Sequence, residues 1–207
     1  MLYPFQILLD FIFPPTNHEL VLRTVSPQRF LLFYDLKQKD SIEFLTSYHI
    51  PSVQAAIAAC KFEHSYHAAQ LLGTLIETHL KTLPSKKTLI IPIPLSTTRE
   101  RERGFNQVAR ALCYVGELPY PFFVATNILS RTHNTVAQTS LSRTARLKNM
   151  HRAFICKPQH REALNEYERI ILCDDVYTTG STLTAAKAAL TPYLSTSTEL
   201  CVLAWAH

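Results

Sequence analysis

The sequence lacks the closely spaced cysteines of a metal-binding or disulfide-bonded domain. Its 207 residues include five cysteines, an odd number, which are widely scattered and never form a CxxC pair. A structural zinc ion needs four thiolate or imidazole ligands, whereas the first forty residues offer His18 and no cysteine. We therefore predict small buried thiols, no zinc site and no disulfide framework.

Long apolar runs are also missing. Although 47% of the residues are hydrophobic, no run approaches the roughly eighteen apolar residues of a membrane-spanning helix. Residues 1–13 are apolar, but they lack a basic leader, carry Asp10 and stop at Pro14 and Pro15. We interpret them as a packed segment rather than a signal peptide. These features predict a cytoplasmic protein with no membrane span.

Glycine is scarce, and one of only four glycines stands in the stretch TTGST, directly after two carboxylates. An apolar segment, RIILC, precedes these acids, and the turn leads into the helical pattern STLTAAKAAL and a second apolar segment, ELCVLAWA. This order predicts a βαβ unit with parallel strands and a right-handed crossover. Because ligands bind at the carboxyl ends of such strands, we expect a binding site over residues 174–182.

The residue types in this turn suit a phosphorylated ribose. Gly180 lets the backbone take a positive φ or come close to a ligand. Free amides at the helix start can cradle a phosphate together with four hydroxyls, those of Thr178, Thr179, Ser181 and Thr182. Asp174 and Asp175 then stand where they can hold vicinal hydroxyls. The alternative is an ordinary turn with a Ser or Thr N-cap; the preceding strand and the two acids favour the binding site.

Positive charge is unevenly distributed along the chain, whose net charge is +5. The basic residues form two clusters: Arg99, Arg101, Arg103 and Arg110, and then Arg131, Arg143, Arg146, Lys148 and Arg152. Such clusters suit a phosphate-rich partner, either a nucleic acid or a polyphosphate metabolite. A solvated helix face is the alternative.

The remaining segments predict the body of an α/β domain. Prolines interrupt residues 1–45, where a strand is expected at Phe30–Tyr34. Apolar residues at helical spacing predict one helix from Pro51 and another that ends before Pro84. The segment TLIIPIP predicts a buried strand. We divide the chain into an N-terminal cap, residues 1–45, and a main domain, residues 46–207.

Several of these segments resemble one known family. The stretch RIILCDDVYTTGST resembles the signature of type I phosphoribosyltransferases that binds 5-phosphoribosyl 1-diphosphate (PRPP). IIPIPLSTTRERERGFNQ and AQTSLSRTARLKNMHRAF, with LLDFIFPP and AACKF, resemble blocks of the ComF family, the competence-associated phosphoribosyltransferase-like proteins that include the GntX type. The resemblance implies a type I phosphoribosyltransferase fold: a doubly wound parallel sheet flanked by helices, with an irregular and helical N-terminal cap.

The resemblance also implies roles for individual residues. Asp174 and Asp175 would hold the ribose hydroxyls and, through them or through water, Mg²⁺. Residues 178–182 would cradle the 5′-phosphate, and the turn at Leu95, with Arg99 and Arg103, would face the diphosphate. Residues 131–149 match a hood region, in which four side chains could reach over a ligand: Gln138, Arg143, Arg146 and Asn149. For these four, a salt-bridged surface helix is the alternative.

Two functions follow from the resemblance. The first is a PRPP-binding phosphoribosyltransferase-like protein that acts in natural competence and DNA uptake, with an unknown acceptor. The second is a non-catalytic module that binds a nucleotide or single-stranded DNA and partners a competence helicase. Purine-salvage relatives carry an acid at the position of Thr178, which weakens a nucleobase-salvage role. Many ComF-like proteins also carry an N-terminal zinc ribbon that is absent here, and the oligomeric state is not predicted.

Overall fold

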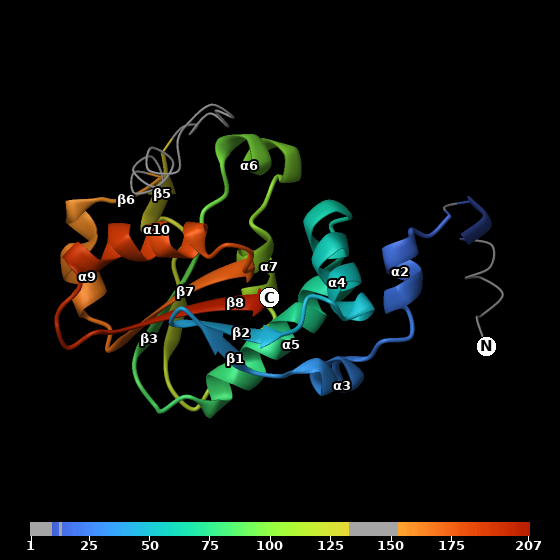
Figure 1. Ribbon diagram of the computed structural model, residues 1–207, viewed down its shortest axis with the longest axis horizontal. Coiled ribbons are helices and arrows are strands. Elements are labelled where there is room, and N and C mark those ends of the chain that lie inside the picture. The colour runs from blue at the N-terminus through green and yellow to red at the C-terminus, as the bar shows by residue number, and fades with distance from the viewer. Residues whose placement is uncertain (1–9, 13, 133–152) are drawn as a thin grey trace.

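The computed structural model describes residues 10–12, 14–132 and 153–207. Its main sheet has six strands in the order β1-β2-β8-β7-β3-β4 (Figure 1). These strands are β1 (Lys37–Lys39), β2 (Ile42–Thr46), β8 (Glu199–Ala206), β7 (Arg169–Val176), β3 (Thr88–Pro92) and β4 (Phe122–Val124). All neighbours pair in parallel except β1 and β2, which form an antiparallel hairpin. The predicted parallel sheet flanked by helices is confirmed.

Strand β7 lies inside the sheet and contributes to the core on both faces. Because successive side chains of a strand point to opposite faces, Ile171 and Cys173 join one hydrophobic cluster, whereas Ile170 and Leu172 join the other. The first cluster includes residues of α4 (Pro51–Phe62), α5 (Tyr66–Thr82) and α7 (Gln107–Leu112), and the second includes residues of α10 (Ser181–Leu190). Figure 1 shows α4 and α5 on one side of the sheet and α10 on the other.

The N-terminal part is helical where a strand was predicted. It contains α2 (Asn17–Leu22), α3 (Pro27–Phe30) and a 3₁₀ turn, η1 (Leu31–Phe33). The predicted strand at 30–34 is wrong because Ser26 caps a helix, accepting a hydrogen bond from the Arg29 amide (3.3 Å), and Pro27 occupies its first turn. The division of the chain at residue 45 stays a prediction. Strand β1, which belongs to the predicted N-terminal cap, is hydrogen-bonded to β2 and so joins the main sheet.

Shorter elements complete the fold. Helix α6 (Thr97–Arg103) follows β3, and β5 (Leu129–Arg131) pairs antiparallel with β6 (Phe154–Cys156). A 3₁₀ turn, η2 (Pro158–His160), and α9 (Arg161–Asn165) lead to β7, and η3 (Thr191–Tyr193) connects α10 to β8. Within the described ranges, no helix has the length and apolar character needed to cross a membrane.

Candidate phosphate- and ribose-binding site

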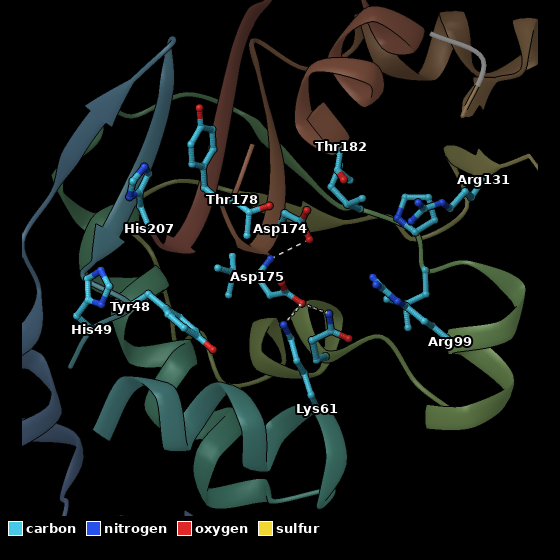
Figure 2. A pocket seen from close by; sticks show the side chains of 16 residues that line it. Tyr48, His49, Lys61, Arg99, Arg131, Asp174, Asp175, Thr178, Thr182 and His207 are labelled. Carbon is cyan, nitrogen blue, oxygen red and sulfur yellow. Dashed lines mark hydrogen bonds and ion pairs between the residues drawn. The ribbon is translucent and has the colours of Figure 1, made fainter. Parts of the chain in front are cut away.

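A cavity of about 610 Å³ opens at the carboxyl ends of β3, β7 and β8. Its lining combines two acids, three cations, two hydroxyls and several aromatic or imidazole rings (Figure 2). The lining residues are Tyr48, His49, Lys61, Ile93, Pro94, Leu95, Arg99, Gln107, Arg131, Asp174, Asp175, Val176, Tyr177, Thr178, Thr182 and His207. The volume lies within the range of small-molecule sites.

The acid pair stands in the last residues of β7. The Oδ1 atom of Asp174 accepts a hydrogen bond from the backbone amide of Asp175 at 2.9 Å. Burial, and then the negative charge of Asp175, raise the pKa of Asp174 to about 7. A cation or a hydroxyl-bearing ligand placed beside the pair would favour the ionised form.

Asp175 is held by side chains from two helices. The ammonium group of Lys61, at the end of α4, lies 3.0 Å from Asp175 Oδ2, and Gln107, at the start of α7, donates a hydrogen bond to the same oxygen. Arg103 Nη1 donates to Gln107 Oε1 at 2.9 Å. The structure therefore places Arg103 behind Gln107, outside the cavity lining, whereas Lys61 contacts the acid pair directly.

Gly180 determines the conformation of the turn between β7 and α10. Gly180 has φ of +69°, and a Cβ atom there would lie 2.5 Å from Cε2 of the Tyr177 ring, so both backbone and space require glycine. The hydroxyls of Thr179 and Ser181 are 2.8 Å apart. Thr178 and Thr182 line the main cavity. A small adjoining depression is lined by the whole turn, Thr178, Thr179, Gly180, Ser181 and Thr182 among them.

Two arginines form the basic end of the cavity. Arg99 comes from the first turn of α6, where the hydroxyl of Ser96 caps the helix, and Arg131 comes from β5. Burial, and then the positive charge of Arg99, lower the pKa of Arg131. Like charges held close together favour binding of an anionic group between them. Leu95, in the predicted diphosphate turn, lines the same cavity.

The opposite end is built from rings. Figure 2 shows Tyr48, His49 and His207 on one side of the acid pair, with Arg99 and Arg131 on the other. The Tyr48 amide donates to the His207 carbonyl at 3.0 Å, which ties the loop after β2 to the end of β8. The His207 ring stacks on Tyr177, with centroids 5.0 Å apart and 18° between the planes.

Most of the sequence-predicted site residues come together at this cavity. Those in or beside its lining are Leu95, Arg99, Asp174, Asp175, Thr178, Thr179, Gly180, Ser181 and Thr182. The hood residues Gln138, Arg143, Arg146 and Asn149 lie outside the described residues. The ligand roles of all these residues stay predictions.

The sequence analysis placed Arg131 in a basic cluster suited to a phosphate-rich partner, but it assigned no site role to five polar or ring-bearing residues of the lining: Tyr48, His49, Lys61, Gln107 and His207. Two of them stand in motifs that carried the family resemblance, Lys61 in AACKF and Gln107 in RGFNQ, so those motifs held the signal. The three ring-bearing residues carry no local signal, because only the pairing of β2 with β8 brings them to the site.

The acid pair suits a magnesium ion that is shared with a ligand. Magnesium prefers carboxylate, phosphate and water oxygens and is commonly bound through one or two carboxylates plus substrate phosphates. Among residues 10–12, 14–132 and 153–207, no group of three His, Cys, Asp or Glu side chains could hold a metal ion alone. Two carboxylates completed by ligand oxygens therefore fit magnesium. The absence of zinc stays a prediction.

A parallel sheet in which strand β7 ends in an acid pair and a glycine-containing hydroxyl turn is the arrangement that the resemblance to type I phosphoribosyltransferases predicts. No model of a protein family matches the sequence. The chain is 31% identical over 161 residues to competence protein F of Haemophilus influenzae (72% of this chain, 66% of that protein). It is 39% identical over 113 residues to competence protein ComFC of Bacillus subtilis (55% and 42%), and 28% identical over 130 residues to ComFC of Streptococcus pneumoniae (63% and 53%). The chain belongs to the ComF family.

The chain spans 66%, 42% and 53% of the lengths of these three relatives. Among solved structures it is similar to adenine phosphoribosyltransferase from Leishmania tarentolae, with a TM-score of 0.43 and 12% identity over 81% of this chain and 78% of that one. It is also similar to the allosteric regulatory enzyme of purine biosynthesis, with a TM-score of 0.41 and 13% identity over 70% and 30% of the two chains.

Proposed function

We propose that this chain binds PRPP with Mg²⁺ in the cavity and acts, in the cytoplasm, as a phosphoribosyltransferase-like protein of natural competence and DNA uptake. One observation carries the proposal: a single cavity holds the acid pair, the glycine turn at the start of α10 and the cations Lys61, Arg99 and Arg131. These groups match the hydroxyls, the 5′-phosphate and the diphosphate of one PRPP molecule.

The arrangement supports cleavage of the bond between C1 and the diphosphate. As that bond breaks, positive charge develops on the ribose ring and negative charge on the leaving diphosphate. Arg99 and Arg131 can stabilise the diphosphate, and Asp174 and Asp175 can orient the ribose, so no covalent nucleophile is required. A bound Mg²⁺ would supply further neutralisation of the diphosphate charge.

Isothermal titration of the full chain with PRPP, with and without Mg²⁺, tests the proposal. Wild-type protein should bind PRPP in a Mg²⁺-dependent manner, and Asp175→Asn should weaken binding at least tenfold because the ribose contact is lost. Asp35→Asn is the matched control, since Asp35 is an exposed acid paired with Lys37 and lies outside the cavity. Equal PRPP affinity in wild type and Asp175→Asn would overturn the assignment.

The competence role is supported by the three relatives, each of which is named a competence protein. Deletion of the gene from its host should lower the frequency of transformation, and a plasmid copy of the wild-type gene should restore it. A copy that carries Asp175→Asn should not. Normal uptake and integration of DNA in the deletion strain would contradict the role.

A second candidate function is binding of single-stranded DNA beside a competence helicase, and an aromatic surface favours it. A second cavity, of about 550 Å³, is lined by Tyr66, Phe105, Asn106, Ala109, Arg110, Cys113 and Tyr114. The guanidinium carbon of Arg110 lies 3.3 Å from the ring centroid of Phe105 and 5.4 Å from that of Tyr66. Tyr66 and Phe62 are each 68% exposed. Rings that accept stacked bases beside arginines are typical of single-strand binding.

Fluorescence anisotropy with a labelled oligothymidylate tests this candidate over a range of salt concentrations. Tyr66→Ala should weaken binding about tenfold, within the 1–3 kcal/mol typical of one stacked base. Arg110→Ala should also reduce the salt slope by about 1, because one phosphate contact is lost. Lys87→Ala is the control, because it also removes a cation that lies over an aromatic ring, that of Tyr167, but at a site away from this surface. Unchanged affinity in both test variants would exclude this surface.

A further inference from the structure

We propose that the ring-lined end of the main cavity, formed by Tyr48, His49 and His207, is the acceptor subsite. Its occupant is a neutral, planar nitrogen heterocycle, and His49 accepts the proton that this acceptor loses. The inference rests on the proposed function, because it assumes PRPP in the rest of the cavity. It assigns the acceptor to residues that carry no sequence motif.

The order of the strand ends places the acceptor. The diphosphate side is the end of β3 with Arg99, and the ribose lies at the end of β7, in the middle of the cavity. In a displacement at C1 the incoming nucleophile approaches from the side opposite to the leaving group. The opposite side of this cavity is formed by the end of β8 and the loop after β2, where Figure 2 shows Tyr48, His49 and His207.

This end of the cavity has a flat, preformed wall. Besides the Tyr48–His207 backbone bond, the His207 amide donates to the Thr46 carbonyl at 3.4 Å. The His207 ring stacks on Tyr177 and lies 4.9 Å from the Phe44 centroid. Tyr48 stays 37% exposed and available to a ligand. Rings that are fixed in this way offer stacking surfaces to a planar molecule.

The charges around the cavity favour a neutral acceptor. Among the described lining residues, the acids are the pair in the middle, and the cations are Lys61, Arg99 and Arg131. The lining at the ring-lined end therefore supplies imidazole and phenol groups, and the ammonium group of Lys39, which contacts His207 Nε2 at 3.5 Å, lies outside that lining. An anionic acceptor would therefore have no counter-charge in the lining at this end, whereas a neutral heterocycle would give up fewer hydrogen bonds to water on entering it.

His49 is better placed than His207 to take a proton. The Nε2 atom of His207 already lies 3.5 Å from the ammonium group of Lys39. Within the described part of the chain, the His49 ring has no hydrogen bond or ion pair, and it faces the cavity. In the reaction, the bond between C1 and the diphosphate oxygen breaks, and its electron pair leaves with the diphosphate. A bond forms between C1 and the ring nitrogen, whose proton passes to His49.

This assignment supplies the base that the glycine turn lacks. A carboxylate at position 178 could accept a proton, whereas the hydroxyl of Thr178 cannot. His49, from the loop after β2, lines the same cavity and can take that role. A general base contributes roughly 10² to 10⁴ to the rate of a proton transfer step. A loss of rate of that size on substitution of His49 would show that its imidazole takes part in the proton transfer and does not only line the cavity.

The test measures diphosphate release and nucleotide formation from PRPP and Mg²⁺ by the full chain. The acceptors are neutral heterocycles that carry a ring N–H (adenine, hypoxanthine and uracil) and anionic ones (orotate and nicotinate). At least one neutral acceptor should support release above the rate with water, and the anionic ones should not. His49→Asn should lower kcat at least a hundredfold with a small change in the KM of the acceptor. Tyr48→Ala should mainly raise that KM, and His160→Asn, outside the cavity lining, should change neither.

Each other outcome overturns a defined part of the inference. If titration shows that wild-type protein does not bind PRPP, both the proposed function and the acceptor subsite fail. If PRPP binds but no neutral heterocycle gives a product or binds to the PRPP-loaded protein, the subsite alone fails. Turnover of the anionic acceptors only would overturn the neutral class. Full activity of His49→Asn would overturn its role as the proton acceptor.

Discussion

Replacing Asp174 by asparagine should stabilise the protein, and the gain should grow with pH. Burial, followed by the negative charge of Asp175, raises the pKa of Asp174 to about 7. In an unfolded chain an aspartate carboxyl titrates near a pH of about 4. Between these values the native state keeps a proton that the unfolded state has released. The free energy of unfolding of the wild-type protein therefore falls as the pH rises through this window.

The magnitude follows from the width of the window. Each pH unit well inside the window changes stability by about 1.4 kcal/mol. The change becomes smaller near pH 7, where the native group itself titrates, so this group should remove about 2 kcal/mol from the wild-type protein between pH 5 and pH 7. Asparagine does not titrate, and its side-chain oxygen can still accept the 2.9 Å hydrogen bond from the Asp175 amide. The stability of Asp174→Asn relative to wild type should therefore increase by about 2 kcal/mol over the same interval.

Urea unfolding at pH 5, 6 and 7 measures this difference, provided that the two proteins have the same dependence on denaturant. Asp35→Asn is again the control, because Asp35 forms an exposed ion pair with Lys37 and has no buried environment to lose. A stability difference between wild type and Asp174→Asn that stays constant from pH 5 to pH 7 would refute an Asp174 that keeps its proton in the native state over this range.

Three further predictions concern the turn, the ion pair and metal content. Gly180→Ala should lower stability by about 1–3 kcal/mol, since alanine would be strained at a φ of +69° and its Cβ would collide with the Tyr177 ring; a thermal midpoint equal to that of wild type would contradict this. Lys61→Met should destabilise the protein by leaving Asp175 without its cation, and Asp175→Asn in the same chain should restore most of the loss; additive losses in urea unfolding would argue against a coupled pair. Purified protein should contain no stoichiometric zinc and should unfold at the same temperature with and without a chelator, so elemental analysis that finds one zinc per chain would refute the sequence interpretation.

The site was predictable from sequence where its chemistry is local. Residues 169–190 contain a strand, an acid pair, a turn and a helix in direct succession. The spacing of the apolar residues and the position of the glycine were enough to predict this order without tertiary information. The structure confirms the βαβ unit and the positive φ of Gly180. The position of the two acids differs slightly from the prediction: they were expected where the strand ends, but β7 continues through them to Val176.

The site was not predictable where tertiary structure brings its parts together. Lys61 lies 114 positions before Asp175, and no periodicity within α4 indicates that its last turn reaches an acid pair. Tyr48 and His207 meet only because β2 pairs with β8. The prediction of a strand at 30–34 was wrong for a local reason. The apolar residues there fit the spacing of a helix as well as that of a strand, and Ser26 followed by Pro27 is a helix start.

The contact between Lys61 and Asp175 has a consequence for the kinetics of the site. Because the Lys61 ammonium group already lies 3.0 Å from the Asp175 carboxylate, a Mg²⁺ ion that binds Asp175 as proposed would have to exchange with Lys61. The net affinity for the ion would then be the difference between the attraction of Asp175 for the ion and its attraction for Lys61. The rate at which the ion binds would depend on how often the ion pair opens. Under the proposed function, such a site would select its cation by competition, because a divalent ion bound to diphosphate would attract Asp175 more strongly than a monovalent ion and would displace Lys61 more readily.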